Sequence, residues 1–311
     1  METVEFPSVR LSFRSLQKYQ EGFLRSLRRK RPETRGTYDR ALRGFQQWFQ
    51  KDGECRFRVE DIERYKRHLQ RKKKLSEMSI STYLTAVRRL CDFLVRKGVL
   101  ADNPGRLVGG SHRPLSHSRE VLTPEEVQAL FEVVSADTVQ DAHERGLRDL
   151  AFVKLMVACG LSEIEIVRAD VQDLRRDGES AVLWVQGKGR VRKDAPVAIP
   201  PDVTAIIQRY LSFRGPLKPA DPLFASAGNR TRGRRMSTRG VRERVNRCLG
   251  AAGVKNGKKG KVTPGSLRHT AALLMAASGA SADEIRERMR LGSIETAMLY
   301  VHQNTQLQKT E

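Results

Sequence analysis

The sequence predicts a mainly α-helical protein with a small antiparallel β-sheet, divided into two domains. Apolar residues recur at helical spacing over most of the 311 residues. Two short apolar segments flank a Gly-Lys-Gly turn, which is typical of a β-hairpin. A stretch rich in Gly, Ser and Pro separates two regions, and each region is long enough to bury a core of its own.

The N-terminal region predicts a bundle of four helices. The expected helices cover 12–30, 34–51, 59–74 and about 79–97. Ser79 or Ser81 is expected to begin the fourth helix, and Gly98 to end it. The bundle is assigned to residues 1–105, and residues 106–121 are interpreted as an interdomain linker.

The second domain is assigned to residues 122–311. Thr123, Pro124 and Glu126 predict the start of a helix, because Thr and Glu three residues apart can form a capping box. Further helices are expected at 146–159, 202–213, 237–251, 264–278, 281–290 and 293–303. The hairpin comprises one strand at 180–186 and a return strand at 195–199.

The chain is strongly basic, with 58 Lys and Arg against 36 Asp and Glu and a net charge of +22. Both regions carry the excess, so a nucleic-acid partner is favoured over a merely soluble basic protein without a polyanion partner. No apolar run is long enough to cross a membrane, and the N-terminal METVEFPSVR lacks a secretory apolar core. The four cysteines form no CxxC pair. We therefore expect a cytoplasmic, nucleoid-associated protein with no metal site and no membrane contact.

Three separated residues are candidates for phosphate chemistry. Arg268 lies in the first turns of an expected helix, where free N–H groups and a guanidinium can together hold a phosphate. For a single arginine taken alone, pairing with a core carboxylate is the favoured interpretation. Lys188 lies in the Gly-Lys-Gly turn, where an ammonium can reach a phosphate or protonate a leaving oxygen, although lysine is common at hairpin tips. Tyr300 occupies an apolar helical position and needs neighbouring cations to act as a nucleophile, since its pKa is ordinarily about 10.

Together these motifs resemble the tyrosine recombinase, or phage integrase, family. The LRHT motif at 267–270 is followed by Tyr300, and the Gly-Lys-Gly turn lies about 80 residues upstream of it. TRGTYDRALRGFQQWF, SISTYLTAVRRLCDFLVRKGVL and ADNP are similar to the helical core-binding (SAM-like) domain of the family. LTPEEVQALF and RDLAFVKLMVACGL resemble the beginning of its catalytic domain. The resemblance covers nearly the whole chain.

The resemblance implies DNA strand exchange. A tyrosine attacks a DNA phosphodiester and forms a 3′-phosphotyrosine link, while two arginines, a lysine and two His or Trp residues stabilise the transition state and move protons. No metal or nucleotide cofactor is implied, because the covalent link conserves the bond energy. Tyr300 matches the nucleophile, Arg268 the second arginine and Lys188 the lysine. His269 and His302 match residues that are usual in the family but outside its essential set.

Three positions depart from the family pattern. In CGLSEIEIVRADVQDL, aligned without a gap, Ser162 takes the place of the first arginine. Gly265 replaces a histidine, and Leu291 (or Ser293, with a two-residue deletion) replaces a His or Trp. Losing one such group costs about 10²–10⁵ in rate, so we expect weak or absent cleavage by the chain alone. The arginines near enough in sequence to compensate are Arg168, Arg286, Arg288 and Arg290.

The resemblance also implies that duplex DNA is held by both domains. The candidate contacts in the first domain are Lys72, Lys73, Lys74, Arg88 and Arg89. The candidate contacts in the second domain are Arg230, Arg232, Arg234, Arg235, Arg239, Arg242 and Arg244. The latter lie in a basic loop and on a helix that Ser237 is expected to cap. Arginines can read bases, but most of these are expected to set position on the backbone, and any one of them could be a solvated surface charge.

Two functions are compatible with these observations. The first is a DNA-binding protein of site-specific recombination or integration, of the kind carried by mobile elements, which exchanges strands through Tyr300 if active. The alternative is a catalytically impaired relative that binds DNA as an accessory or regulatory factor. The expected partners are double-stranded DNA and either further copies of the chain or other recombinase subunits.

Overall fold

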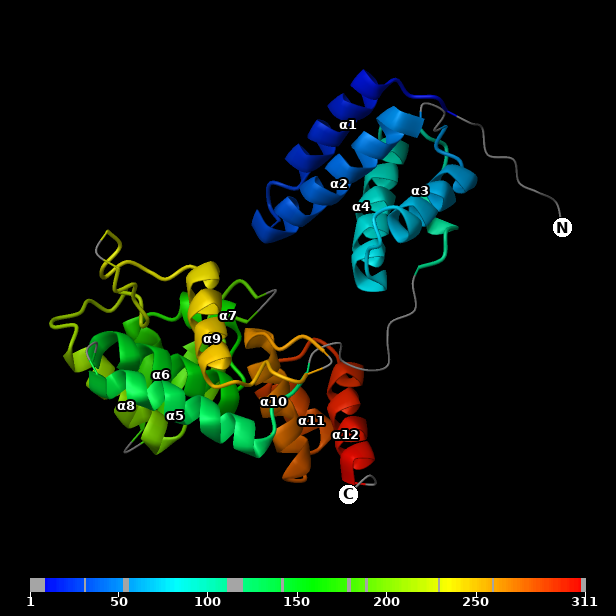
Figure 1. Ribbon diagram of the computed structural model, residues 1–311. Coiled ribbons are helices and arrows are strands. Elements are labelled where there is room, and N and C mark those ends of the chain that lie inside the picture. Colours follow the sequence, from blue (N-terminus) through cyan, green and yellow to red (C-terminus); the bar gives the residue numbers. More distant parts are fainter. Residues whose placement is uncertain are drawn as a thin grey trace. The chain divides into compact units, whose positions relative to one another are not determined.

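The computed structural model describes residues 9–30, 32–52, 56–110, 120–140, 143–177, 180–187, 190–228, 230–258 and 260–308. Its contacts divide the chain into two compact units, Met1–Arg113 and Pro114–Glu311, each with a hydrophobic core of its own. Helices dominate both units and the second also holds a small antiparallel sheet, so the predicted fold class is confirmed (Figure 1). Within the described ranges, no helix is long and apolar enough to cross a membrane.

The first unit is a four-helix bundle (Figure 1). Its elements are α1 (Phe13–Ser26), α2 (Pro32–Asp52), α3 (Val59–Arg71), α4 (Glu77–Arg96) and the 3₁₀ turn η1 (Pro104–Arg106). The fourth helix begins earlier than expected, because the hydroxyl of Ser76, rather than Ser79 or Ser81, caps it. Phe45 and Trp48 pack against the ring of Tyr65 in the core, with ring centroids 5.0 and 5.2 Å away.

The second unit holds the remaining helices and the sheet. Its helices are α5 (Pro124–Gln140), α6 (His143–Ala158), α7 (Glu163–Arg168), η2 (Val171–Asp173), α8 (Pro201–Ser212), α9 (Thr238–Ala251), α10 (Pro264–Ala277), α11 (Ala282–Arg288) and α12 (Ile294–Gln308). The strands β1 (Leu174–Asp177), β2 (Ser180–Val185) and β3 (Ala195–Ile199) form an antiparallel sheet in the order β1-β2-β3. The capping box of Thr123 and Glu126 is confirmed, as is the cap of α9 by Ser237.

Two features of this unit position the candidate site. Helix α6 packs against α5 and α8 in the main core and also contacts α10. Helix α12 packs against α10 and α11 through a separate cluster of mostly small side chains, and these three helices lie together in Figure 1. The end of α6, the beginning of α10 and the end of α11 are therefore brought to one place, with α12 beside them.

Candidate active site and nucleic-acid interface

The carboxylate of Glu165, in the short helix α7, is the centre of the candidate active site. Only 2% of this side chain is exposed. Its Oε2 accepts hydrogen bonds from the backbone N–H and the hydroxyl of Ser162, at 2.8 and 2.7 Å. A buried carboxylate is costly unless cations and donors surround it, and two arginines do so here.

Arg268 and Arg290 meet at Glu165 and at the carbonyl of Gly160. Arg268 donates from Nη1 to Oε2 of Glu165 at 2.9 Å and to the oxygen of Gly160 at 2.6 Å. Arg290 donates from Nε to Oε1 of Glu165 at 2.7 Å, and from Nη2 to Oε2 at 3.3 Å and to the oxygen of Gly160 at 3.1 Å. Arg268 also donates to the carbonyl of Met289. The Arg268 side chain is 20% exposed and that of Arg290 is 4% exposed, so Arg268 is the one that reaches the surface.

Gly160 permits this convergence through its backbone. It follows α6 with a φ of +61°, in the left-handed region that residues with a Cβ rarely adopt. A Cβ at this position would lie 2.4 Å from the sulfur of Met289. A glycine is therefore required for the chain to turn here and aim its carbonyl at both guanidinium groups.

The electrostatics of the cluster keep Glu165 ionised. Burial by itself raises the pKa of Glu165, but the hydrogen bonds and charges of Arg290 and Arg268 outweigh it and hold that pKa below its ordinary value. Burial lowers the pKa of Arg268, and Arg290 adds to this, while the charge of Glu165 and the phenol of Tyr300 oppose it. An arginine remains protonated under these conditions, so the cluster holds two positive charges and one negative charge.

Tyr300 is hydrogen-bonded to His269, the residue that follows Arg268. Its phenol oxygen lies 2.6 Å from Nδ1 of His269, and only 2% of the tyrosine is exposed. His269 lies on α10 and Tyr300 on α12, so this hydrogen bond spans two helices.

Lys188 lies outside the described residues, as does Gly189. The residue before it, Gly187, is described and lies next to the cluster, because a Cβ on it would be 3.7 Å from Oε1 of Glu165. The connection between β2 and β3 therefore begins beside the two arginines.

The three positions that depart from the family pattern have structural roles of their own. Ser162 precedes α7 and donates its hydroxyl to Glu165. Gly265 lies in the first turn of α10, and Leu291 is partly buried against the cluster formed by α10, α11 and α12. His302 is exposed on α12, away from the hydrogen bond of Tyr300 with His269.

The candidate DNA contacts of the second unit divide into two groups. Arg235 donates to the carbonyl of Val167 at 2.8 Å and pairs with Asp170, and Arg244 pairs with Asp149, so both are bound within the fold. The others are exposed and are either on the loop or on α9: Arg230, Arg232, Arg234, Arg239 and Arg242. Three of these five make surface ion pairs. Arg232 pairs with Glu144, Arg239 with Glu243 and Arg242 with Glu163.

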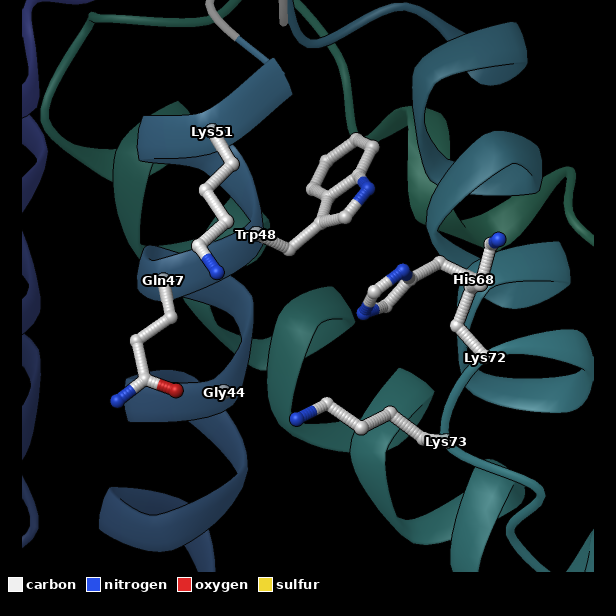
Figure 2. Close-up of a pocket in the computed structure, with 7 residues that line it drawn as sticks. All are labelled: Gly44, Gln47, Trp48, Lys51, His68, Lys72 and Lys73. Atoms are coloured by element: carbon white, nitrogen blue, oxygen red, sulfur yellow. The ribbon is translucent and has the colours of Figure 1, made fainter.

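The first unit presents a basic pocket of about 490 Å³ between α2 and α3. Figure 2 shows the imidazole of His68 and the ammonium of Lys73 directed into it, opposite Gln47 and Trp48. The lining residues are Gly44, Gln47, Trp48, Lys51, His68, Lys72 and Lys73. An adjoining pocket adds Arg40 and Arg43. Aromatic and cationic groups around one concave surface suit a nucleic-acid backbone.

Lys72, Lys73 and Lys74 are all exposed, as is Arg89. Arg88 is partly buried and donates from Nε to the carbonyl of Gly105 and from Nη2 to that of Val108, both at 2.7 Å. Arg88 therefore holds the segment after α4 with two of its side-chain donors.

The fold and the site together define a class of protein. Its members have a helical bundle followed by a mainly helical unit, and the second unit carries the arginine, histidine and tyrosine side chains of the candidate site. Residues 120–306 match the phage integrase family model, and residues 16–98 match that of the phage integrase N-terminal SAM-like domain. The chain therefore belongs to the phage integrase family.

Two relatives span most of the chain. It is 29% identical over 298 residues to tyrosine recombinase XerC of Serratia marcescens, covering 93% of this chain and 91% of the relative. It is 28% identical over 233 residues to XerC of Salmonella typhi, covering 75% and 71%.

Two solved structures share the fold. The XerH site-specific recombinase bound to a palindromic difH substrate has a TM-score of 0.72 at 18% identity, covering 96% of this chain and 83% of that one. The Tn1549 transposon integrase in complex with transposon right end DNA has a TM-score of 0.70 at 14% identity, covering 95% and 98%.

Sequence reasoning did not single out Glu165 as a functional residue. A glutamate in a short helix is ordinarily exposed, and no sequence signal shows that Glu165 is buried between two guanidinium groups. Arg290 was one of four arginines near enough in sequence to compensate for Ser162. Its spacing from the other three carries no information about which of them turns inward.

Proposed function

We propose that this chain is a site-specific DNA recombinase that cleaves one strand of a duplex through Tyr300. The hydrogen bond of 2.6 Å between Tyr300 and His269 carries this proposal, because an imidazole nitrogen beside a phenol is placed to take its proton. Arg268, one residue before His269, offers a partly exposed guanidinium for the phosphate. The relatives named above, which are recombinases and an integrase, support the same activity.

The proposed reaction exchanges one phosphoester bond for another. The phenol oxygen of Tyr300 attacks the phosphorus of a DNA backbone phosphate and forms a 3′-phosphotyrosine link. The phenol proton passes to Nδ1 of His269, the bond from phosphorus to the 5′-oxygen breaks, and that oxygen takes a proton from the ammonium of Lys188. Attack by another 5′-hydroxyl reverses these steps and rejoins the strand.

Arg268 has a charge-stabilising role in this scheme. Its Nε takes no part in the bonds to Glu165, Gly160 and Met289, so this donor can face a phosphate oxygen. Preorganised donors of this kind stabilise the negative charge that develops on the phosphoryl oxygens and contribute about 10²–10³ to the rate.

DNA contacts outside the pocket hold the duplex in place. We propose that Lys72 and Lys73 of the first unit contact backbone phosphates, together with Lys74 and Arg89. In the second unit we propose the exposed arginines of the loop and of α9 for the same role. Phosphate contacts fix the position of a protein on DNA without reading sequence, so we assign these residues to affinity.

The proposal is tested by trapping the covalent intermediate. A binding site is first selected from a random-sequence duplex library with the full chain, and nicked versions of it are incubated with the protein. Loss of the short 5′-hydroxyl fragment traps the adduct, which denaturing gel electrophoresis detects. We expect an adduct with the natural chain and none with Tyr300→Phe, while both bind the duplex equally. No adduct on any nicked form of a tightly bound site would rule out cleavage by the chain alone.

One observation favours the second function, a DNA-binding accessory protein without cleavage. Ser162 carries a neutral side chain whose hydroxyl donates to Oε2 of Glu165 at 2.7 Å, so this position supplies no side-chain positive charge to the pocket. The same assay separates the two functions. The accessory role predicts tight binding with no adduct from the natural chain, and an adduct from Ser162→Arg.

A further inference from the structure

We propose that Arg290 is a positioning residue that supplies the pocket with the positive charge that Ser162 does not provide. The inference rests on the proposed function and extends it, because it explains how the site keeps an anion-binding charge balance. Its guanidinium lies 2.7 Å from Oε1 of Glu165, on the carboxylate that also holds Arg268.

The net charge of the cluster depends on Arg290. Glu165 and Arg268 by themselves would form a neutral ion pair, in which the attraction of Arg268 for a phosphate is largely offset. Arg290 pairs with Glu165 through two donors, Nε and Nη2, and returns the cluster to one net positive charge. Because Arg290 is 4% exposed and Arg268 20% exposed, the extra charge is buried while Arg268 remains partly accessible to an anion.

The end of α11 places Arg290 and the carbonyl of Met289 against Arg268. Arg268 and Arg290 also share the carbonyl of Gly160, at 2.6 and 3.1 Å. Arg290 has a φ of +54°, in the left-handed region, and follows Met289, the residue that caps the end of α11. This unusual backbone position turns the side chain inward at the end of α11, and the carbonyl of the preceding residue, Met289, accepts a bond from Arg268. The segment at the end of α11 thus fixes Arg268 from two sides.

The other two candidate arginines of α11 are placed differently. Arg286 pairs on the surface with Asp283 at 3.2 Å, and Arg288 is exposed on α11. Neither has a hydrogen bond to Glu165 among the interactions of the described residues. Of the arginines of α11 and its end, Arg290 is therefore the one that the structure connects to Arg268, and Arg288 provides a matched control on the same segment.

The first test measures the rate of adduct formation on the nicked duplex for the full chain. We expect Arg290→Ala to slow the rate by about 100-fold or more while DNA binding changes by less than about threefold. Arg288→Ala should leave the rate unchanged. The double variant Ser162→Arg with Arg290→Ala should recover to within about tenfold of the natural rate, because an arginine at 162 would lie beside the same carboxylate.

The double variant separates this role from a purely structural one. If Arg290→Ala reacts at the natural rate, the inference is wrong. If Arg290→Ala unfolds but the double variant is folded by circular dichroism and remains as slow as an inactive chain, the inference is also wrong. Recovery of rate together with fold supports it.

A second readout keeps the inference testable if the natural chain forms no adduct, a result that would overturn the proposed cleavage alone. Inorganic phosphate is titrated into the full chain by calorimetry, and the signal lost in Arg268→Ala defines binding at the pocket. We expect Arg290→Ala to weaken this component at least tenfold and the double variant to restore it. Phosphate binding by Arg290→Ala equal to that of the natural chain would overturn the inference.

Discussion

The phenol oxygen of Tyr300 and Nδ1 of His269 lie 2.6 Å apart, across the packing of α12 on α10. This hydrogen bond connects the C-terminal helix to the helix that carries Arg268. It places the proposed nucleophile and its proton acceptor in contact before DNA is bound, so the proposed reaction begins from a formed pair. The stability of α12 on the second unit should depend on the same bond.

The first prediction concerns the coupling of this pair. Replacing His269 by Ala removes the partner of a buried hydroxyl, so we expect a loss of about 1–3 kcal/mol in unfolding free energy and a slower adduct. Tyr300→Phe should cost about 1 kcal/mol. In a double-mutant cycle by urea unfolding, the two effects should be non-additive by about 1 kcal/mol. Additive losses would show that the hydrogen bond contributes nothing to stability.

A second prediction follows from the burial of Glu165. At neutral pH, Glu165→Gln leaves two guanidinium groups against a neutral amide. We therefore expect the free energy of unfolding to fall by about 3 kcal/mol. Glu163→Gln, two residues away in α7, removes a more exposed pair with Arg242 and should cost less than about 1 kcal/mol. Urea unfolding of both variants at pH 7 checks the difference, and equal losses would contradict it.

A third prediction gives the pH dependence of the same residue. The pKa of Glu165 is lower in the folded chain than its ordinary value of about 4.3. The stabilisation is therefore fully present above the ordinary value and is lost as the pH falls through the folded value. The natural chain should lose more stability than Glu165→Gln as the pH is lowered below about 5. Parallel stability curves for the two proteins would refute this assignment.

The fourth prediction tests the backbone at Gly160. An alanine at this position would have to adopt the left-handed φ of +61°, and its Cβ would clash with the sulfur of Met289. We therefore expect Gly160→Ala to lower the free energy of unfolding by at least about 1–3 kcal/mol. Gly250 lies within α9, where a Cβ would meet no atom within 4 Å. Gly250→Ala should leave stability unchanged or raise it by up to about 1 kcal/mol. Thermal unfolding of the two variants provides the comparison, and a tolerated Gly160→Ala is the contrary result.

A fifth prediction concerns the basic pocket of the first unit (Figure 2). Lys72→Gln with Lys73→Gln should weaken DNA binding and lower the slope of log affinity against log salt by about 0.9 for each lost phosphate contact. The matched control changes two exposed cations of α1, Arg14 and Lys18, to Gln. Fluorescence anisotropy from low to high salt measures both slopes. An unchanged slope for the pocket variant would remove these lysines from the interface.

The sequence predicted the long helices and the caps at Thr123 and Ser237, because periodic apolar positions and capping side chains act locally, but it placed the cap of α4 at Ser79 or Ser81 instead of Ser76. It missed β1 and α7 for physical reasons. The strand Leu174–Asp177 has no alternating pattern and exists through pairing such as that of Leu174 with Leu183. The helix Glu163–Arg168 is short and is stabilised by its tertiary contacts.

The residues of the candidate site that belong to sequence motifs could be predicted. The residues that join it through buried ion pairs could not. Arg268, His269 and Tyr300 stood out by their order and spacing. The burial of Glu165, and the inward turn of Arg290, depend on a left-handed backbone and on contacts from three distant segments. Arg88 shows the same limit, since its sequence position indicates a candidate DNA contact, whereas the structure shows its guanidinium bonded to two backbone carbonyls.

The most direct test of the account identifies the amino acid that becomes linked to DNA. After the trapped adduct is digested with trypsin and nuclease, mass spectrometry is applied to the peptide 291–309, which lies between Arg290 and the cleavage site at Lys309. We predict that this peptide carries a nucleotide on Tyr300. A nucleotide linked to any other residue, or an adduct that persists in Tyr300→Phe, would contradict it.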